Sequence, residues 1–356
     1  MPHDAIGNDV LGMAECFEAA GYPTTIFAQW VHPTREKFAR RIDLEPEDTW
    51  KCAGDILIYH HALHWQFGES VLANARTRVI VKYHNVTPPG FYEHYSDKLF
   101  RECGEGVEAT RRIARRRNAW FWGDSSFNAE ELVRMGAAPE RCRVVPPCHS
   151  IENELGGASL DNLSFGRYRG AHTILFVGGL RPHKGHLKAI EVFAHYRGIS
   201  DRKSRLLFVG GSDPNLERYE ADIRARAVQF GVDQEVDLVL GASPAQLRAF
   251  YLTASVFLCV SEHEGFCVPL VESMYFRLPI VAWGTTAVKE TCGDAGIVID
   301  DFQVASLAEA IDECTENPAL ARELACRGRT RYESWFRPAA IQKRLLELLA
   351  EIVERG

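Results

Sequence analysis

Residues 261–272, which read SEHEGFCVPLVE, decide how this chain folds. They directly follow Val256–Val260, a run too short for a helix and too uniformly apolar for a half-exposed strand. They lead into Leu270–Phe276, an apolar-periodic segment, with Pro269 at a first-turn position that proline favours. The pattern therefore predicts a buried strand, a loop and a helix in succession.

The same pattern is repeated throughout the second half of the chain. Short apolar runs alternate with segments whose apolar residues recur every three or four positions. The expected strands are Thr173–Val177, Arg205–Val209, Val236–Leu240, Val256–Val260, Pro279–Ala282 and Gly296–Ile299, and the expected helices are His186–Tyr196, Leu216–Phe230, Pro244–Thr253 and Leu270–Phe276. Such alternation predicts a doubly wound parallel sheet, in which ligands bind at the carboxyl ends of the strands.

The first half shows the same alternation more weakly. Its expected helices are Val10–Ala20 and Asn128–Met135, and its expected strands are Thr24–Phe27, Asp55–Tyr59, Arg78–Lys82, Ala119–Trp122 and Arg143–Val145. A parallel α/β domain normally opens with a strand, but here a helix comes first. We therefore expect the opening strand to be absent.

The 356 residues are enough for about two domains of ~150 residues each. A stretch rich in Gly, Ser, Asn and Glu, without periodicity, separates the two halves. We therefore expect an α/β protein of two facing Rossmann-like domains with a cleft between them. The expected parts are an N-terminal domain at 1–150, a linker at 151–170, a C-terminal domain at 171–337 and a final amphipathic helix at 338–356.

The bulk composition narrows the class of protein. The net charge of -7 gives no overall basic field, which argues against a nucleic-acid partner. The ten cysteines contain no C-x-x-C pair, and several sit in apolar runs, so buried thiols are expected rather than a metal site or disulfides. No secretory signal and no apolar run of ~18 residues is present. The expected location is the cytoplasm, with contact to a membrane surface at most.

Two carboxylates lie around the predicted helix start. Glu264 is expected in the loop and Glu272 in the first turn of the helix, where they can accept hydrogen bonds from hydroxyl groups of a sugar and a ribose. The backbone amides expected to be free at this helix start, and so able to hold a phosphate, are those of Gly265, Phe266, Cys267 and Val268. The alternative is that Glu272 only complements the helix dipole and that Glu264 is solvated.

The loop after Thr173–Val177 reads GGLRPHKGH. Gly178 and Gly179 would let a phosphate approach the backbone, and Arg181 and Lys184 would supply positive charge to a leaving diphosphate. The glycine spacing is wrong for a Walker A loop. The chain contains no D-x-D motif, so a metal-held diphosphate is not expected. The alternative is a simple surface turn before a helix.

Three features of the first half are weaker signals. His84 follows the strand Arg78–Lys82 and would face the cleft, although a single histidine at a strand end is often structural. Gly7 lies in the turn Asp4–Asn8, which is expected before the first helix. The basic run Arg111–Arg117 is either a solvated helix face or a contact with an anionic lipid carrier or membrane surface.

Together these residues resemble glycosyltransferase family 4, the group 1 type of retaining enzymes with the GT-B fold. The resemblance is close from Ile174 to Ile299, and Glu264-x7-Glu272 is its most specific motif. It is looser in the first half, where it rests on Asp4–Asn8, Tyr83–Pro88 and Asp124–Asn128.

The resemblance implies roles for individual residues. Glu264 would contact the donor sugar, Glu272 the ribose and Lys184 the diphosphate, while His84 would line the sugar site from the other domain. The remaining donor-binding positions would be Gly7, Gly178, Gly179, Arg181, Gly211, Leu240, Gly241, Gly265, Phe266, Cys267 and Val268, with Leu240 and Gly241 near the base. The final helix, Pro338–Val353, would pack back on the first domain.

One position departs from the family pattern. The family usually has an arginine where Gly179 stands. Arg181 lies two positions further along the chain, so its side chain would leave the backbone in a different direction. The sequence leaves open whether Arg181 replaces the missing arginine.

The activity implied by the resemblance is that of a retaining glycosyltransferase of the hexosyltransferase type. A UDP- or GDP-sugar would donate the sugar, and a hydroxyl of a saccharide or lipid-linked acceptor would receive it, without a metal or another cofactor. Two alternatives remain: a GT-B sugar-nucleotide epimerase, and a non-catalytic protein that binds sugar nucleotides. The sequence does not identify the sugar, the base, the acceptor or the linkage.

Overall fold

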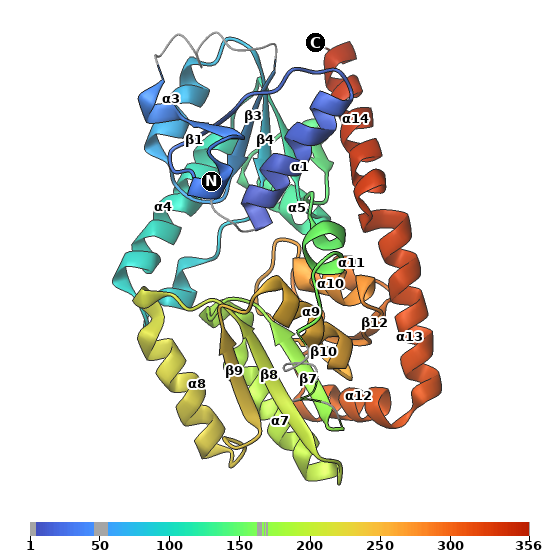
Figure 1. The fold of residues 1–356 in the computed structure, drawn as a ribbon. Coiled ribbons are helices and arrows are strands. Elements are labelled where there is room, and N and C mark those ends of the chain that lie inside the picture. The colour runs from blue at the N-terminus through green and yellow to red at the C-terminus, as the bar shows by residue number, and fades with distance from the viewer. Residues whose placement is uncertain (1–4, 46–55, 162–165, 167, 169, 356) are drawn as a thin grey trace. The chain divides into compact units, whose positions relative to one another are not determined.

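The computed structural model describes residues 5–45, 56–161, 166, 168 and 170–355. The chain divides into two units. The first unit contains residues 1–88, 102–150 and 335–356, and the second contains residues 89–101 and 151–334. Each unit is built on a parallel β-sheet with helices packed against it (Figure 1).

The first unit has a central four-stranded sheet and a separate strand pair, both parallel. The central sheet has the order β3 (Ile56–His61), β4 (Arg78–Tyr83), β5 (Ala119–Gly123) and β6 (Cys142–Val144), and the pair is β1 (Ile26–Ala28) and β2 (Ala39–Arg41). The helices are α1 (Ala5–Ala19), α3 (Gln66–Asn74), α5 (Ser126–Met135), α14 (Pro338–Arg355) and most of α4 (Asp97–Ala114), whose first residues, Asp97–Arg101, belong to the second unit.

The central strand β4 is buried on both faces because its side chains alternate between two apolar clusters. Ile80 packs in a cluster with Met13 of α1 and Leu345 of α14. Val79 and Val81 point into the other cluster, together with side chains of α3, α4 and α5. A uniformly apolar strand such as β4 fits this arrangement, because parallel sheets are covered on both faces.

The second unit has a six-stranded parallel sheet in the order β12-β11-β10-β7-β8-β9. Its strands are β7 (His172–Val177), β8 (Ser204–Gly210), β9 (Val236–Leu240), β10 (Val256–Cys259), β11 (Ile280–Trp283) and β12 (Gly296–Ile299). Its helices are α7 (His186–Ile199), α8 (Glu217–Gln229), α9 (Pro244–Thr253), α10 (Val268–Tyr275), α11 (Val288–Cys292), α12 (Val304–Glu316) and α13 (Pro318–Arg331).

The strand order of this sheet contains a reversal that determines where a ligand can bind. From β7 the chain proceeds outward through β8 to β9, and it then returns to place β10 on the other side of β7. The connections after β7 and β10 therefore leave the sheet in opposite directions at its carboxyl edge. In doubly wound sheets this reversal opens the crevice in which ligands bind.

The predicted strands and helices of the second half are all present, with ends shifted by a few residues at most. Helix α5 follows Ser125, whose side chain accepts a hydrogen bond from the amide of Asn128, as expected for a capping serine. Two predictions touch residues outside the described ranges. They are the opening strand, which concerns residues 1–4, and parts of the linker.

Two helix starts were predicted wrongly. Helix α1 begins at Ala5, so Gly7 lies inside the helix and not in a turn. The Gly and Asn residues there disfavour a helix, but tertiary packing overrides this preference, because Met13, Cys16 and Phe17 of the same helix are buried in the core of the first unit. Asp9 accepts a hydrogen bond from the amide of Cys148. Helix α10 begins at Val268, so Glu272 lies in the second turn and not in the first.

Two further predictions concern membranes and cysteines. Within the described residues, no helix is both long and apolar enough to cross a membrane. The cysteines of these residues are free thiols, and most are buried as expected, whereas Cys326 is exposed.

Candidate active site

The loop after β10 holds the Glu264 carboxylate in a fixed position. The side chain of Glu264 is only 7% exposed. Its backbone amide donates a hydrogen bond to Thr286 Oγ1 at 2.9 Å, and Thr286 itself adopts a left-handed backbone conformation with φ of 43°. The neighbouring Thr285 donates its hydroxyl to the carbonyl of Ser261 at 2.6 Å. The loop after β11 therefore fixes the loop after β10.

Lys184 and Glu264 form a direct ion pair at the strand reversal. Lys184 ends the short helix Pro182–Lys184 after β7, and its Nζ lies 2.8 and 2.9 Å from the two carboxylate oxygens of Glu264. Burial alone would lower the pKa of Lys184, but the adjacent Glu264 carboxylate raises it above its usual value. Lys184 is therefore a charged ammonium group that remains partly exposed, at 22% of its side chain.

Gly185 allows the Lys184 loop to approach β10 closely. Gly185 has φ of +81°, and a Cβ at this position would lie 2.2 Å from the carbonyl oxygen of Val260. Only glycine fits both conditions. The close approach explains why the side chains of Lys184 and Glu264 meet, a contact that the motifs alone do not predict.

Two helices begin beside this ion pair. Helix α7 starts after Gly185, and α10 starts after Cys267, which has φ of 74°. Within the described residues, neither helix start is capped by a side-chain hydrogen bond. The first amides of a helix and the positive end of its dipole attract anions. The loops that carry Lys184 and Glu264 thus also carry two helix starts suited to phosphate groups.

Glu272 lies one turn into α10, where its carboxylate accepts a hydrogen bond from the hydroxyl of Tyr251 in α9. Burial raises the pKa of Glu272 to about 7, although the bond from Tyr251 acts in the opposite direction. Glu272 therefore changes charge near neutral pH. The sequence does not predict this property, because it depends on how deeply the folded protein buries the side chain.

Arg181 already contacts two polar groups of the second unit. Its guanidinium lies 3.3 Å from the Asp213 carboxylate and 3.4 Å from the Tyr92 hydroxyl. Gly179 is less constrained, because a Cβ there would make an ordinary contact of 3.7 Å with the carbonyl of Gly211. The backbone at Gly179 therefore has room for a Cβ.

The glycines at the ends of β7, β8 and β9 keep three strands close together. A Cβ on Gly210 would lie 1.9 Å from the carbonyl oxygen of Gly178, so only glycine is accommodated there. Gly241 follows β9 and donates its amide to the carbonyl of Gly210 at 2.9 Å. Leu240 is 39% exposed beside it, and so offers an apolar surface at this edge of the sheet.

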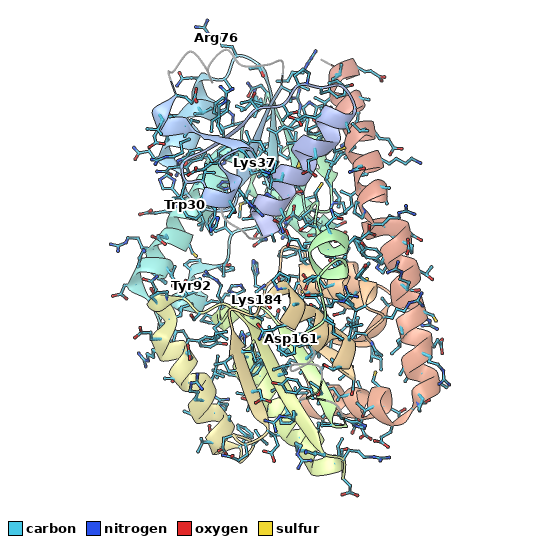
Figure 2. The ribbon with its side chains drawn as sticks, viewed as in Figure 1. Trp30, Lys37, Arg76, Tyr92, Asp161 and Lys184 are labelled. Carbon is cyan, nitrogen blue, oxygen red and sulfur yellow. The ribbon has the colours of Figure 1, made fainter. Side chains whose placement is uncertain are left out.

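Sequence reasoning missed a segment that joins this site. The short helix Pro89–Tyr92 belongs to the second unit, and the Tyr92 hydroxyl lies 3.5 Å from Nδ1 of His183. The ring of Phe91 packs edge-on against His183 as well. Burial lowers the pKa of His183 well below its usual value, so this imidazole is neutral. Figure 2 labels Tyr92 and Lys184 in this unit.

No sequence signal identifies this segment as part of the site. Pro89–Tyr92 lies in the first half of the chain and shows no periodicity that links it to the second. Thr286 was missed for a similar reason, because its role depends on a backbone hydrogen bond to a distant loop. Contacts of this kind are determined by tertiary structure.

In the first unit, His84 belongs to a buried polar cluster. His84 Nδ1 lies 3.0 Å from Asp124 Oδ2, and His84 Nε2 lies 2.9 Å from Nδ1 of His60. Both ring nitrogens of His84 are thus hydrogen bonded within the protein, and its side chain is only 4% exposed. Lys82 is fully buried and donates hydrogen bonds to Asp124 and to the carbonyl of Val145.

Asp9, His60 and His84 have ligand atoms that lie within 4.8 Å of one another, a spacing that could suit a metal ion. The ring geometry favours a hydrogen bond instead. The two imidazoles are nearly coplanar, at 16°, with ring centres 5.2 Å apart, so both nitrogens lie close to the line that joins the centres. The two nitrogens therefore point at each other, as in an N–H···N hydrogen bond, and not at a common ion. The Lys82 ammonium, 3.9 Å from Asp9 Oδ2, already supplies a cation.

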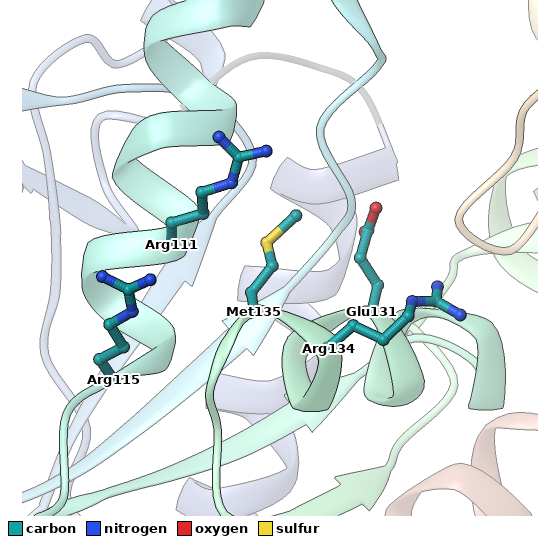
Figure 3. A pocket seen from close by; sticks show the side chains of 5 residues that line it. All are labelled: Arg111, Arg115, Glu131, Arg134 and Met135. Atoms are coloured by element: carbon teal, nitrogen blue, oxygen red, sulfur yellow. The ribbon is translucent and has the colours of Figure 1, made fainter.

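A basic hollow lies between α4 and α5 of the first unit (Figure 3). Its volume is about 290 Å³, and it is lined by Arg111, Arg115, Glu131, Arg134 and Met135. All three arginines are exposed. Part of the basic run therefore lines a concave surface with a net positive charge.

The structure thus brings most of the predicted site residues together at one edge of the second unit. These are Gly178, Gly179, Arg181, Lys184, Gly211, Leu240, Gly241, Glu264, Gly265, Phe266, Cys267, Val268 and Glu272. His84 and Gly7 belong to the first unit, where Gly7 shares helix α1 with Asp9.

Comparison with known proteins agrees with this architecture. Residues 164–331 match the family described as glycosyl transferases group 1. The D-inositol 3-phosphate glycosyltransferase of Acidothermus cellulolyticus is 31% identical over 207 residues, which are 55% of this chain and 45% of that protein. The GDP-mannose:cellobiosyl-diphosphopolyprenol alpha-mannosyltransferase of Xanthomonas campestris is 26% identical over 52% of this chain and 47% of that protein. The matched region spans about half the length of these relatives.

Solved structures resemble the chain over nearly its whole length. Sucrose-phosphate synthase from Thermosynechococcus elongatus has a TM-score of 0.76 at 18% identity, covering 98% of this chain and 93% of that one. Anabaena Alr3699/HepE in complex with UDP and glucose has a TM-score of 0.72 at 16% identity, covering 99% and 97%. Residues 164–331 therefore form a domain of the glycosyl transferases group 1 family, in a chain that has the GT-B fold.

Proposed function

We propose that this protein is a retaining glycosyltransferase that moves a sugar from a nucleotide sugar to an acceptor hydroxyl. The observation that carries the proposal is the Lys184–Glu264 ion pair, which lies at the strand reversal between two uncapped helix starts. A cation and two helix dipoles suit a diphosphate, and an adjacent carboxylate suits the hydroxyls of a sugar. The described relatives that act on GDP-mannose are consistent with such a donor.

Each part of the donor has a proposed partner. The diphosphate binds the starts of α7 and α10, with Lys184 and Arg181 as cations, and Gly178, Gly179 and Gly211 leave space for its approach. The ribose hydroxyls bind Glu272, and the base lies beside Leu240 and Gly241. The amides of Gly265, Phe266, Cys267 and Val268 hold phosphate and sugar. The role of His84 at a sugar stays a prediction from the sequence, because both of its ring nitrogens are hydrogen bonded within the first unit.

Binding of the donor would rearrange the Lys184–Glu264 pair. Lys184 exchanges its carboxylate partner for a phosphate oxygen, and Glu264 becomes free to accept hydrogen bonds from the sugar. The exchange keeps both groups ionised, so no proton has to be moved. Each group has a charged or hydrogen-bonded partner before and after binding, which avoids leaving a buried charge unpaired.

The reaction breaks the bond between the anomeric carbon and the diphosphate and forms a bond from that carbon to the acceptor oxygen on the same face. The acceptor proton passes to an oxygen of the departing diphosphate. Lys184 and the helix starts stabilise the negative charge that develops on the diphosphate. The proposed reaction uses no metal, because these groups already supply positive charge at the leaving group.

For the acceptor we propose a saccharide, free or linked to a lipid. Arg111, Arg115 and Arg134 line a hollow of about 290 Å³ that suits a phosphate of a lipid carrier or an anionic membrane surface. We accordingly place the protein in the cytoplasm, in peripheral contact with a membrane. Flotation with anionic and neutral lipid vesicles would test this contact.

The test of the function is a panel of UDP- and GDP-sugars incubated with saccharide and lipid-linked acceptors. Free nucleoside diphosphate together with a glycosylated acceptor means transfer, whereas an isomerised sugar means an epimerase, and binding without turnover means a binding protein. The variant Glu264→Ala should lower turnover by roughly tenfold or more, since it removes a positioned charge from the reacting sugar. Glu262→Ala is the matched control, because Glu262 is a neighbouring carboxylate that forms an ion pair with Lys188, at 3.6 Å, and not with Lys184. Wild-type transfer by Glu264→Ala would refute the role of Glu264.

A further inference from the structure

Two cysteine thiols meet at the base of the loop that carries Glu264. Cys259 is the last residue of β10, and Cys267 immediately precedes α10. Their sulfur atoms lie 3.9 Å apart, a distance at which one thiol donates a hydrogen bond to the other. Both residues are buried, Cys259 at 3% exposure and Cys267 at 7%. The loop 260–266 is therefore flanked by two facing thiols, which only a small reagent can reach.

The contact between the sulfur atoms makes the two thiols unequal. The hydrogen bond lowers the pKa of Cys259, although burial acts in the opposite direction. The same bond, together with burial, raises the pKa of Cys267 well above its usual value. Ser261 also lies beside Cys259, with its hydroxyl oxygen 3.8 Å from the sulfur. Cys259 is therefore the thiol that ionises first, and the thiolate is the form that reacts with oxidants.

Other cysteines of the second unit provide a contrast. Burial raises the pKa of Cys292 and that of Cys314 to about 12, so both thiols stay protonated near neutral pH. Cys326 lies on α13 and is exposed, so it serves as the reference for oxidation of a surface thiol. Proximity and ionisation together thus distinguish Cys259 and Cys267 from these three.

We propose that Cys259 and Cys267 form a modification site, at which hydrogen peroxide joins the two sulfurs in a disulfide and thereby inactivates the donor site. The Cys259 thiolate attacks one peroxide oxygen, the O–O bond breaks, and hydroxide leaves. The Cys267 sulfur gives up its proton and attacks the resulting sulfenic acid, so that the S–S bond forms as the oxygen departs in water. Overall the two thiols are oxidised, and the peroxide is reduced to two water molecules.

The disulfide acts on the donor site through the loop that it closes. The sulfurs approach each other by about 2 Å, from 3.9 Å to the length of an S–S bond, which is about 2 Å. Glu264, which pairs with Lys184, lies in this loop, and the first amide of α10 follows Cys267 directly. A displacement of about 1 Å at a reacting group can lower turnover by about 100-fold. The loss of transfer rests on the proposed function, whereas formation of the disulfide does not.

The disulfide can be detected without a sugar nucleotide. Trypsin releases the peptide 249–277, which contains Cys259 and Cys267 and no other cysteine. The folded protein is treated with hydrogen peroxide, the excess is removed with catalase, and the protein is then unfolded with iodoacetamide present. We expect this peptide to lack alkyl groups and two hydrogens, and to take up two alkyl groups after reduction with dithiothreitol.

Two results of this peptide map would overturn the proposal. One is a fully alkylated peptide at a peroxide dose that has oxidised all of Cys326. The other is a sulfinic or sulfonic acid at either sulfur without any disulfide between them. The map uses the wild-type chain, so it decides the question even where a cysteine variant folds poorly.

Activity measurements connect the disulfide with the donor site. We expect peroxide to lower kcat/KM for transfer by the wild type roughly tenfold or more, and dithiothreitol to restore it. Cys259→Ala cannot form the disulfide and should keep its activity under the same treatment. Cys326→Ser is the control, because it lacks the exposed thiol and should lose activity as the wild type does. Equal loss in Cys259→Ala, or a disulfide that leaves transfer unchanged, would overturn the proposal.

The two measurements separate this proposal from the proposed function. A wild-type protein that neither binds nor turns over any nucleotide sugar would refute the proposed function itself. The peptide map would still show whether Cys259 and Cys267 become linked, so the two failures are distinguishable.

Discussion

Each unit contains a lysine that forms an ion pair with a buried carboxylate, and the two lysines differ in how completely they are enclosed. Lys82 is 0% exposed and has two hydrogen-bond partners, Asp124 and the carbonyl of Val145, with Asp9 as a second nearby carboxylate. Lys184 is 22% exposed, and among the residues that the structure describes it pairs with Glu264 alone. Lys82 is thus held on all sides by the protein, whereas Lys184 can turn to a ligand.

Because the two lysines differ in this way, we propose that the charge of Lys82 has a structural role and that the charge of Lys184 has a functional one. When one partner of a buried ion pair is removed, the other partner is left as an unpaired charge in the protein interior, which destabilises the folded state. An ion pair at a surface edge can exchange one partner for a ligand at little cost. The pKa values of both lysines lie above the usual value, because nearby carboxylates outweigh burial, so charge state alone does not distinguish them.

The variant Lys82→Met tests whether Lys82 is structural, and it should have the largest effect on stability. This change leaves Asp124 and Asp9 buried without their cation, and we expect the free energy of unfolding to fall by about 3–5 kcal/mol. Urea unfolding followed by circular dichroism measures the change. Lys343→Met is the control, because the Lys343 side chain is 78% exposed. An unfolding midpoint equal to that of the wild type would show that Lys82 is not structural.

Lys184→Met should lower activity strongly and stability only slightly, which is the opposite of what we expect for Lys82→Met. We expect kcat/KM for glycosyl transfer to fall roughly 100- to 1000-fold, because a positive charge is lost where the leaving diphosphate becomes negative. The loss of unfolding free energy should be smaller than for Lys82→Met, since water reaches this pair. Activity assays and urea unfolding on the same samples measure both. A stability loss as large as that of Lys82→Met, with normal transfer, would remove the distinction.

Arg181 offers a smaller effect at the same site. Its side chain is 41% exposed and its guanidinium also pairs with Asp213, so we expect Arg181→Ala to raise the Michaelis constant of the donor by about tenfold. The second change Gly179→Arg places a cation where the family usually has one, and a Cβ at this position makes only ordinary contacts. Recovery of donor affinity in the double variant would show that the two positions serve the same phosphates. No loss in Arg181→Ala would assign Arg181 to Asp213 alone.

The strand and helix pattern of the second unit could be predicted because its strands are short, apolar and separated by periodic helices. The carboxyl-edge position of Glu264 and Lys184 followed from the same pattern. Their direct contact did not, because it depends on the close approach at Gly185. The start of α1 was predicted wrongly because the local preference at Gly7 was outweighed by the packing of Met13 and Phe17 of the same helix into the core.

The first unit was harder to predict because its polar cluster joins distant residues. Asp9, His60, Lys82 and Asp124 carry no shared motif, and only the folded sheet brings them to His84. Pro89–Tyr92 was missed in the second unit for the same reason. Local patterns report secondary structure and strand edges, whereas the partners of a buried charge are determined by tertiary packing.

The smallest expected effect concerns Glu272, which extends the comparison from lysines to a carboxylate. Burial raises its pKa to about 7, so the carboxylate that we propose as the acceptor of ribose hydroxyls is present above that pH and lost below it. Donor affinity should therefore weaken several-fold from about pH 8 to about pH 6. Glu272→Gln should bind more weakly and abolish this dependence. Tyr251→Phe removes a hydrogen bond that lowers the pKa, so it should move the transition to higher pH. Calorimetric titration with UDP and GDP measures all three proteins, and an unchanged transition in Glu272→Gln would assign it to another group.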